Sequence, residues 1–209
     1  MSTEKDLLEL EQNVHREAMK DGLQELLMAL MLCFSGVVLV DGRFVIFLAL
    51  IIVFQTTVIE KFREAYTYPR LGKFKIREEK QQLSATGVLF TVVPLVILLG
   101  FMMIASHLEL TYLYPWLIWA PAAFGLVFVG PSMYLVGKSG LRRYYGLAGL
   151  GIVLGLLFSQ FAFPTPLDRL VVYLFSLAVI IGVVGGMILA RFLSTYPVLI
   201  TEDSANGAQ

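Results

Sequence analysis

Long apolar runs separated by short polar segments dominate this chain. A helix needs about 20 mostly apolar residues to cross a hydrocarbon core about 30 Å thick. Six runs approach or reach that length, at residues 23–40, 44–59, 85–105, 115–136, 145–163 and 170–190. Unbroken apolar runs are typical of helices, whereas the strands of a membrane barrel alternate between polar and apolar residues. The pattern therefore predicts an all-α, polytopic bundle of six transmembrane helices.

The first 22 residues carry a different pattern. Leu7, Leu10, Val14 and Ala18 recur at helical spacing among charged and polar residues. This spacing favours an amphipathic helix that lies at the membrane interface and leads into the first span. A solvated leader is the alternative. The predicted organisation is an amphipathic segment at 1–22, a transmembrane domain at 23–192 with a long polar loop at 60–84, and a tail at 193–209.

Lysines and arginines are divided unevenly between the two sides of a six-span arrangement. Fourteen of the sixteen fall in the N-terminal segment, the 60–84 loop, the polar turn at 137–143 and the residues after 190. Only Arg43 and Arg169 fall in the turns on the opposite side. Loops rich in Lys and Arg face the cytoplasm. The sequence therefore predicts a multi-pass protein of the cell membrane with both termini in the cytoplasm.

The 60–84 loop is the most distinctive polar segment. Pro69 and Gly72 favour turns, and residues 73–77 alternate between basic and apolar. Such a pattern can place cations on anionic lipid headgroups, which is simple anchoring to the bilayer; a docking surface for a protein partner is the alternative. Four acids offset the seven bases of the loop, which argues against nucleic-acid binding. The candidate functional residues of the loop are Tyr68, Pro69, Arg70, Gly72, Lys73, Lys75 and Arg77.

The ends of the second and sixth spans resemble each other. Residues 67–69 read Thr-Tyr-Pro, as do residues 195–197, and a basic residue followed by Phe precedes each copy. This echo favours a duplicated helical hairpin with both copies entering from the same side; chance similarity between apolar hairpins is the alternative. The segment 68–72, Tyr-Pro-Arg-Leu-Gly, resembles a Tyr-Pro-Arg-x-Gly segment in the cytoplasmic loop of an uncharacterised prokaryotic family of multi-pass membrane proteins. The resemblance implies a membrane location and no particular activity.

Polar and small residues within the spans provide further candidates. No ionisable side chain of the Asp, Glu, Lys, Arg or His type lies away from the span ends, which argues against an ion-coupled pump that works through carboxylates. Gln55, Thr56 and Gln160 are candidates for a polar substrate site, although hydrogen bonding between helices is the simpler interpretation. Prolines at 94, 121 and 131 predict kinks in the third and fourth spans. We expect the fifth and sixth spans to pack against each other through Gly151, Gly155, Gly182 and Gly186, with a homo-oligomer interface as the minority alternative.

Composition narrows the function further. Hydrophobic residues make up 57% of the 209 residues and charged residues only 15%, against about 25% charged in a soluble domain. One cysteine and two histidines leave too few ligands for a His/Cys metal site, and no nucleotide-binding, metalloprotease or nucleophile-elbow motif is present. The sequence favours a non-enzymatic membrane subunit or scaffold that uses no cofactor and acts through helix packing and the basic loop. A small transporter or permease component with a polar site near Gln55 or Gln160 is the alternative.

Overall fold

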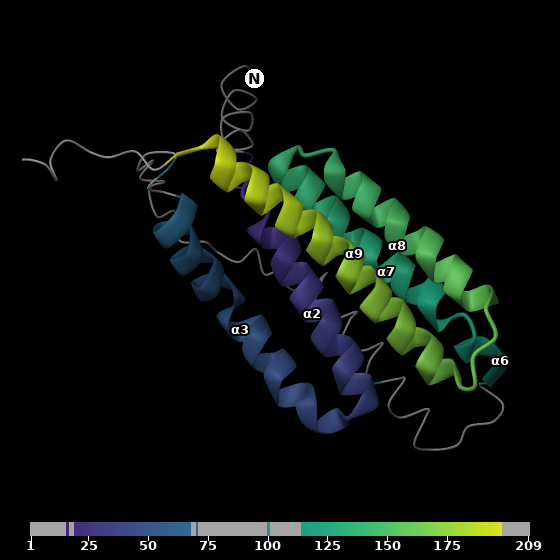
Figure 1. Cartoon of the computed structure of the whole chain (residues 1–209). Coiled ribbons are helices and arrows are strands. Elements are labelled where there is room, and N and C mark those ends of the chain that lie inside the picture. The colour runs from purple at the N-terminus through teal and green to yellow at the C-terminus, as the bar shows by residue number, and fades with distance from the viewer. Residues whose placement is uncertain (1–15, 17–18, 68–69, 71–99, 101–113, 198–209) are drawn as a thin grey trace, which may run out of the picture.

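The computed structural model describes residues 16, 19–67, 70, 100 and 114–197 (Figure 1). Within these residues the chain is all-α, as the sequence predicts. The longer helices are α2 (Leu23–Val40), α3 (Val45–Phe62), α7 (Ala120–Ser139), α8 (Arg143–Gln160) and α9 (Pro166–Thr195). The short elements are the 3-10 turn η1 (Gly42–Phe44), the π turn η2 (Arg63–Thr67) and helix α6 (Tyr114–Leu117).

The five longer helices run side by side along the length of the molecule (Figure 1). α2 packs along α9, α7 packs along α8, and α3 lies against the outer side of α2. One end of this bundle, hereafter the Asp21 end, holds the start of α2, η2, the turn between α7 and α8, and the end of α9. The opposite end, hereafter the Asp41 end, holds the turn between α2 and α3, the start of α7 and the turn between α8 and α9.

Gly22 and Asp41 set the boundaries of α2. Gly22 precedes the helix with a φ of 75°, a left-handed conformation that glycine adopts without steric penalty. After the helix, the Asp41 carboxylate accepts a hydrogen bond of 3.0 Å from the backbone N–H of Arg43, which fixes the tight turn into η1. The predicted helix at 23–40 and the polar turn after it are therefore confirmed.

The start of α9 corrects the sequence prediction. The polar residues between the predicted fifth and sixth spans, 164–169, predict a turn, but α9 begins at Pro166. The Thr165 hydroxyl accepts a hydrogen bond of 3.1 Å from the backbone N–H of Asp168, which makes Thr165 the N-cap. Pro166 occupies the first turn, where its missing N–H costs nothing. α9 also continues to Thr195, into the predicted tail, so its 30 residues form a helix about 45 Å long.

The predicted fourth span is divided. Ile118 and Trp119 separate α6 from α7, and Pro121 lies in the first turn of α7. Pro121 therefore begins this helix and does not kink it, whereas Pro131 does lie inside α7. Gly140, with a φ of 64°, ends the helix in the left-handed conformation that is common at helix C-termini.

Several predicted segments fall largely or wholly outside the described residues. These are the amphipathic segment 1–22, the third span at 85–105 and most of the tail. The 60–84 loop begins later than predicted, because residues 60–62 belong to α3 and residues 63–67 form η2. The duplication of the hairpins stays a prediction. Its two phenylalanines are in different environments, since Phe62 is half exposed and Phe192 is buried.

α9 occupies the centre of the bundle. Four of its side chains at helical spacing are fully buried, namely Leu170, Leu174, Leu177 and Ile181. The ring of Tyr173 packs edge-on against Phe124 of α7, with ring centroids 6.3 Å apart. Its hydroxyl donates a hydrogen bond of 3.2 Å to the backbone oxygen of Gly151 in α8. α9 therefore joins the α7–α8 pair to α2.

Glycines bring α7 and α8 close together. A β-carbon on Gly155 would lie 2.5 Å from the backbone oxygen of Pro121, and one on Gly125 would lie 2.5 Å from that of Gly151. Both oxygens belong to the backbone of the facing helix and cannot give way. Gly151 and Gly155 therefore pack against α7. The prediction that they pack against the sixth span is wrong, because a small-residue ridge indicates close approach but does not identify the partner.

The glycines of α9 pack against α2 in the same way. A β-carbon on Gly185 would lie 2.9 Å from the Cβ of Glu25, and one on Gly182 would lie 3.4 Å from the Cβ of Ala29. Within the described residues, nothing lies within 4 Å of a β-carbon on Gly186. Gly182 thus lies at a helix contact, but with α2 and not with α8, and Gly185 replaces Gly186 at the closest approach.

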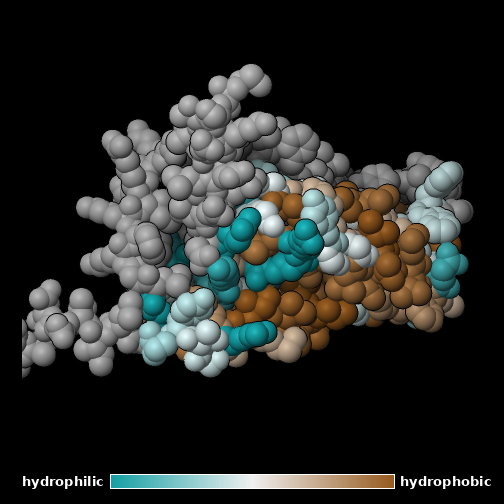
Figure 2. Space-filling model, turned by 90° about the horizontal axis from the view of Figure 1, so that it is seen from above, coloured by the Kyte–Doolittle hydropathy of each residue, from teal (hydrophilic) through white to brown (hydrophobic). Residues whose placement is uncertain are grey.

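Three described helices, α2, α7 and α9, are long and apolar enough to cross a membrane. Large hydrophobic side chains are exposed along the bundle, on α3 and α8 as well as on these three. In the view of Figure 2, a hydrophobic brown surface lies between polar residues in the left half and a smaller polar group at the right-hand edge. Exposed apolar surface of this extent is typical of contact with lipid or another apolar partner.

Candidate functional site

The candidates predicted from the sequence do not form one site within the described residues. Outside the description lie Tyr68, Pro69, Gly72, Lys73, Lys75 and Arg77, and the side chains of Gln55 and Thr56. Gln160 is exposed at the last position of α8, at the Asp41 end. Arg70 lies at the Asp21 end, where its guanidinium donates hydrogen bonds of 2.8 Å to the backbone oxygens of Leu193 and Tyr196.

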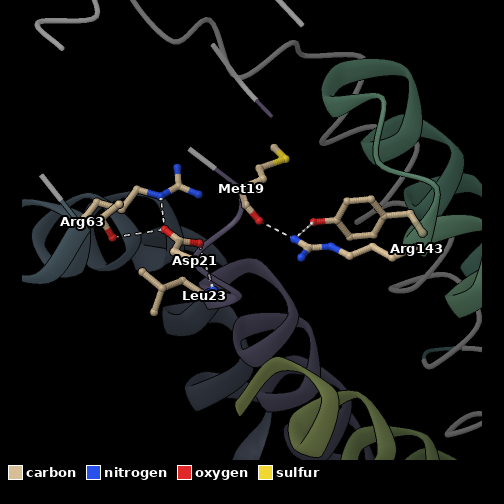
Figure 3. A network of polar contacts seen from close by, with 7 residues as sticks. Met19, Asp21, Leu23, Arg63 and Arg143 are labelled. Atoms are coloured by element: carbon tan, nitrogen blue, oxygen red, sulfur yellow. Dashed lines mark hydrogen bonds and ion pairs between the residues drawn. The ribbon is translucent and has the colours of Figure 1, made fainter. Parts of the chain in front are cut away.

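A buried network of polar contacts lies at the Asp21 end (Figure 3). Asp21 is fully buried before the start of α2, and its Oδ1 accepts a hydrogen bond of 3.1 Å from the backbone N–H of Leu23. Its Oδ2 accepts from Arg63 Nε at 2.9 Å and from Thr67 Oγ1 at 3.4 Å. Arg63 and Thr67 are the first and last residues of η2. Asp21 therefore binds both ends of the π turn.

Glu25 lies one turn further along α2 and is also fully buried. Arg143, at the start of α8, places its Nε 2.8 Å from Glu25 Oε1. The same guanidinium donates to the backbone oxygen of Met19 and, at 3.4 Å, to the hydroxyl of Tyr144 (Figure 3). Its central carbon lies 5.2 Å from the centroid of the Tyr144 ring, within the range of a cation–π contact. Arg143 thus joins α8 to α2 and to the residues that precede α2.

The charges of the network balance, with two carboxylates facing two guanidiniums. The carboxylate side chains are 0% exposed, and the side chains of Arg63 and Arg143 are 13% and 26% exposed. Both carboxylate oxygens of Glu25 lack a geometrically satisfactory hydrogen bond among the described residues. Glu25 therefore depends on Arg143 for charge compensation, and a buried charge without such compensation is costly. Chemically, the network is suited to holding α2, η2 and α8 together at one end.

Arginines also bind the free backbone oxygens near helix ends. The last carbonyl groups of a helix have no partner within the helix, and a cation there is favoured by the helix dipole. At the Asp41 end, Arg169 is 7% exposed and donates hydrogen bonds of 3.2 Å to the backbone oxygens of Ile118 and Ser159. At the Asp21 end, Arg16 donates at 3.4 Å to the backbone oxygen of Ser139, the last residue of α7.

One sequence signal points to the network. Glu25 interrupts the first apolar run, and Asp21 precedes it by four residues, a spacing that places both carboxylates on one side of a helix start. Their partners cannot be identified from local spacing, because Arg63 is 42 positions from Asp21 and Arg143 belongs to the predicted polar turn at 137–143, far along the chain from Glu25. The sequence pattern therefore does not reveal the four residues as a group.

Side chains that commonly bind metal ions do not cluster in the described part of the chain. Among the described residues, no group of three or more His, Cys, Asp and Glu residues could hold a metal ion. Cys33 is a free thiol that is partly buried in α2, where it packs beside the apolar core. A partly buried thiol in such surroundings behaves as a small hydrophobic residue.

The apolar helices define the class of the protein. α2, α7 and α9 can each cross a membrane by length and composition, so the chain is a multi-pass membrane protein in contact with the lipid bilayer. Comparison with protein-family models, curated proteins and solved structures found no match to this chain. The resemblance of residues 68–72 to a prokaryotic membrane-protein family therefore stays a prediction.

Proposed function

We propose that this chain is a non-enzymatic membrane subunit or scaffold with six spans. It presents its basic loop at the Asp21 end to anionic lipid headgroups and to a protein partner. The observation that supports this best is the apolar interior between the two ends of the bundle. Apolar side chains and glycine contacts fill that interior in the described helices, while the charged side chains lie at the helix ends.

The groove between α2 and α3 illustrates this apolar character. Its volume is about 220 Å³, and it is partly open to the surroundings. The described side chains that line it are all aliphatic or aromatic, namely Leu27, Leu30, Leu50, Ile51, Phe54 and Val58. A ligand with hydrogen-bonding groups would lose its water there without finding polar partners among these described side chains, which is costly. The groove therefore suits contact with lipid better than passage of a polar solute.

A transporter would need a polar cavity that reaches the middle of the bundle near Gln55 or Gln160. Gln160 is exposed at the end of α8, far from the middle of that helix. The side chain of Gln55 is not among those that the structure describes, so it supports neither the subunit hypothesis nor the transporter hypothesis. The subunit hypothesis is therefore the better supported of the two.

Charge at the Asp21 end supports a cytoplasmic location for both termini. The start of α2 and the end of α9 lie at this same end (Figure 1). The described basic residues of the predicted cytoplasmic segments also lie within, or next to, elements of this end. They include Lys61, Arg70, Arg142 and Arg191. Because cation-rich segments stay in the cytoplasm, we assign the Asp21 end to the cytoplasmic side.

Cross-linking in native membranes, followed by mass spectrometry, tests the proposed function. A loop variant carries Lys73→Gln, Lys75→Gln and Arg77→Gln. A matched control carries Lys61→Gln, Arg142→Gln and Arg191→Gln, which removes three exposed cations from described residues at the same end. We expect the wild type and the control to cross-link the same partner protein and the loop variant to lose it. Equal cross-linking by the two variants, or uptake of polar solutes by liposomes that contain the purified chain, would contradict the subunit hypothesis.

A further inference from the structure

The π turn η2 lies in the first part of the basic loop, residues 60–84, and carries contacts that attach this part to the bundle. π turns are rare and occur frequently at functional sites. Arg63 and Thr67 are the first and last residues of η2, and Arg70 follows three positions later. Arg63 and Thr67 bind the Asp21 carboxylate, while Arg70 binds two backbone oxygens at the end of α9. These three residues therefore attach the chain to the start of α2 and to the end of α9. The remaining cations of the loop follow them, from Lys73 onward.

The Arg70 contact also joins the residue that follows the first Tyr-Pro pair to the tyrosine of the second pair. Arg70 directly follows the first Tyr-Pro pair, at residues 68–69. One of its two acceptors is the backbone oxygen of Tyr196, the tyrosine of the second pair. α9 ends at Thr195, and the proline at 197 has no N–H to continue the helical ladder. A guanidinium can donate to two carbonyl oxygens at once, and Arg70 uses this capacity at the end of α9.

We propose that Asp21 is the positioning residue of the first, described part of the basic loop, which is η2 and Arg70. It holds both ends of η2, and together with the Arg70 contact it fixes this part of the loop against the start of α2 and the end of α9. Without the carboxylate, Arg63 would be a largely buried cation with no ion-pair partner among the described residues. Thr67, which is only 2% exposed, would lose the acceptor of its hydroxyl. This inference rests on the proposed function only for the role of the loop; the positioning itself is a property of the described residues.

Distance measurement by pulsed electron resonance tests the inference on the full chain in lipid nanodiscs. Spin labels are placed at Tyr66→Cys and Thr195→Cys, both exposed positions, in a Cys33→Ala background. We expect one narrow distance in the parent protein and loss of that narrow distance with Asp21→Asn. Asp21→Glu, which keeps the charge, is expected to restore it. Asp41→Asn is the matched control, because Asp41 is also hydrogen-bonded to a backbone N–H two residues ahead but lies at the opposite end.

An unchanged narrow distance in Asp21→Asn overturns the inference. If Asp21→Asn does not fold, the double variant Asp21→Leu with Arg63→Met decides, since it removes the Asp21 contacts with η2 and leaves neither charge of the pair behind. Retention of the narrow distance in this double variant then overturns the inference, and its loss supports it. The cross-linking experiment with the loop variant tests the proposed function separately, because the spin-label distance does not depend on any partner.

Discussion

The Glu25–Arg143 pair allows a direct test of how this bundle compensates buried charge. Arg143→Met removes the guanidinium and leaves the fully buried Glu25 without the partner that lies 2.8 Å away. Breaking one side of a buried ion pair typically costs about 3–5 kcal/mol. Arg143 keeps 26% of its side-chain surface exposed, so part of the charge is already solvated. We therefore expect a loss near the lower limit, about 3 kcal/mol.

Removing both charges should reverse most of this loss. Replacement of a buried ion pair by apolar residues of similar volume is often neutral or stabilising. In the double variant Glu25→Leu with Arg143→Met, no uncompensated charge remains. The backbone oxygen of Met19 still loses its donor, which costs about 1 kcal/mol. We expect the double variant to be less stable than the wild type and more stable than Arg143→Met.

Reversible denaturant unfolding in detergent micelles measures these differences in unfolding free energy. Arg142→Met is the matched control, because it makes the same substitution at the neighbouring, exposed position and should change stability by no more than about 0.5 kcal/mol. Two results would refute the reasoning. One is an Arg143→Met protein as stable as Arg142→Met, and the other is a double variant less stable than Arg143→Met.

Three further predictions concern helix packing, capping and orientation. Gly155→Ala places a β-carbon 2.5 Å from the backbone of α7 and should destabilise the protein by about 1–3 kcal/mol. Gly186→Ala is the control, because its β-carbon meets no described atom within 4 Å, and equal unfolding midpoints for the two variants would contradict the α7–α8 contact. Thr165→Ala removes the N-cap of α9 and should cost about 1 kcal/mol, while Thr165→Ser, which keeps the hydroxyl, should remain near the wild type in the same assay. A reporter that is active only in the cytoplasm should work when fused to Gln209 and fail when inserted after Asp41, and activity at the second site would contradict the six-span orientation.

The ends of a helix could be predicted from the sequence where a residue next to the boundary determines it. α2 begins and ends where the sequence predicts, because Gly22 and Asp41 flank an apolar run that contains one charge. The start of α9 was missed although its signal is also local. Thr165, Pro166 and Asp168 form a helix N-terminus, but a pair of prolines beside an Asp and an Arg also fits a turn. Only the continuing helix distinguishes the two interpretations, and apolar content alone does not show where that helix starts.

Packing partners were not predictable, because they depend on which helices become neighbours in space. Gly151 and Gly155 indicate a close approach, yet nothing in their spacing distinguishes α7 from α9. The same limit applies to Glu25. Its position in an apolar run shows that the carboxylate needs a partner, but only the placement of α8 beside the start of α2 identifies that partner as Arg143. The ion-pair network is therefore a property of the tertiary fold and not of any one span.

The arginines have a structural role that a count of positive charges does not reveal. The positive-inside rule treats Lys and Arg alike, but arginines also make long-range contacts with carboxylates and helix ends in this bundle. They include Arg63, Arg70, Arg143 and Arg169. A planar guanidinium has five donors and can bridge two acceptors, which an ammonium group does with less defined geometry. Arg169 is therefore held at the Asp41 end by the backbone oxygens it binds. Its presence there does not weaken the uneven division of Lys and Arg between the two ends, from which we predict the orientation of the chain in the membrane. Arg43, whose side chain is 92% exposed, is then the one basic residue among the described residues of that end that lies open at the surface.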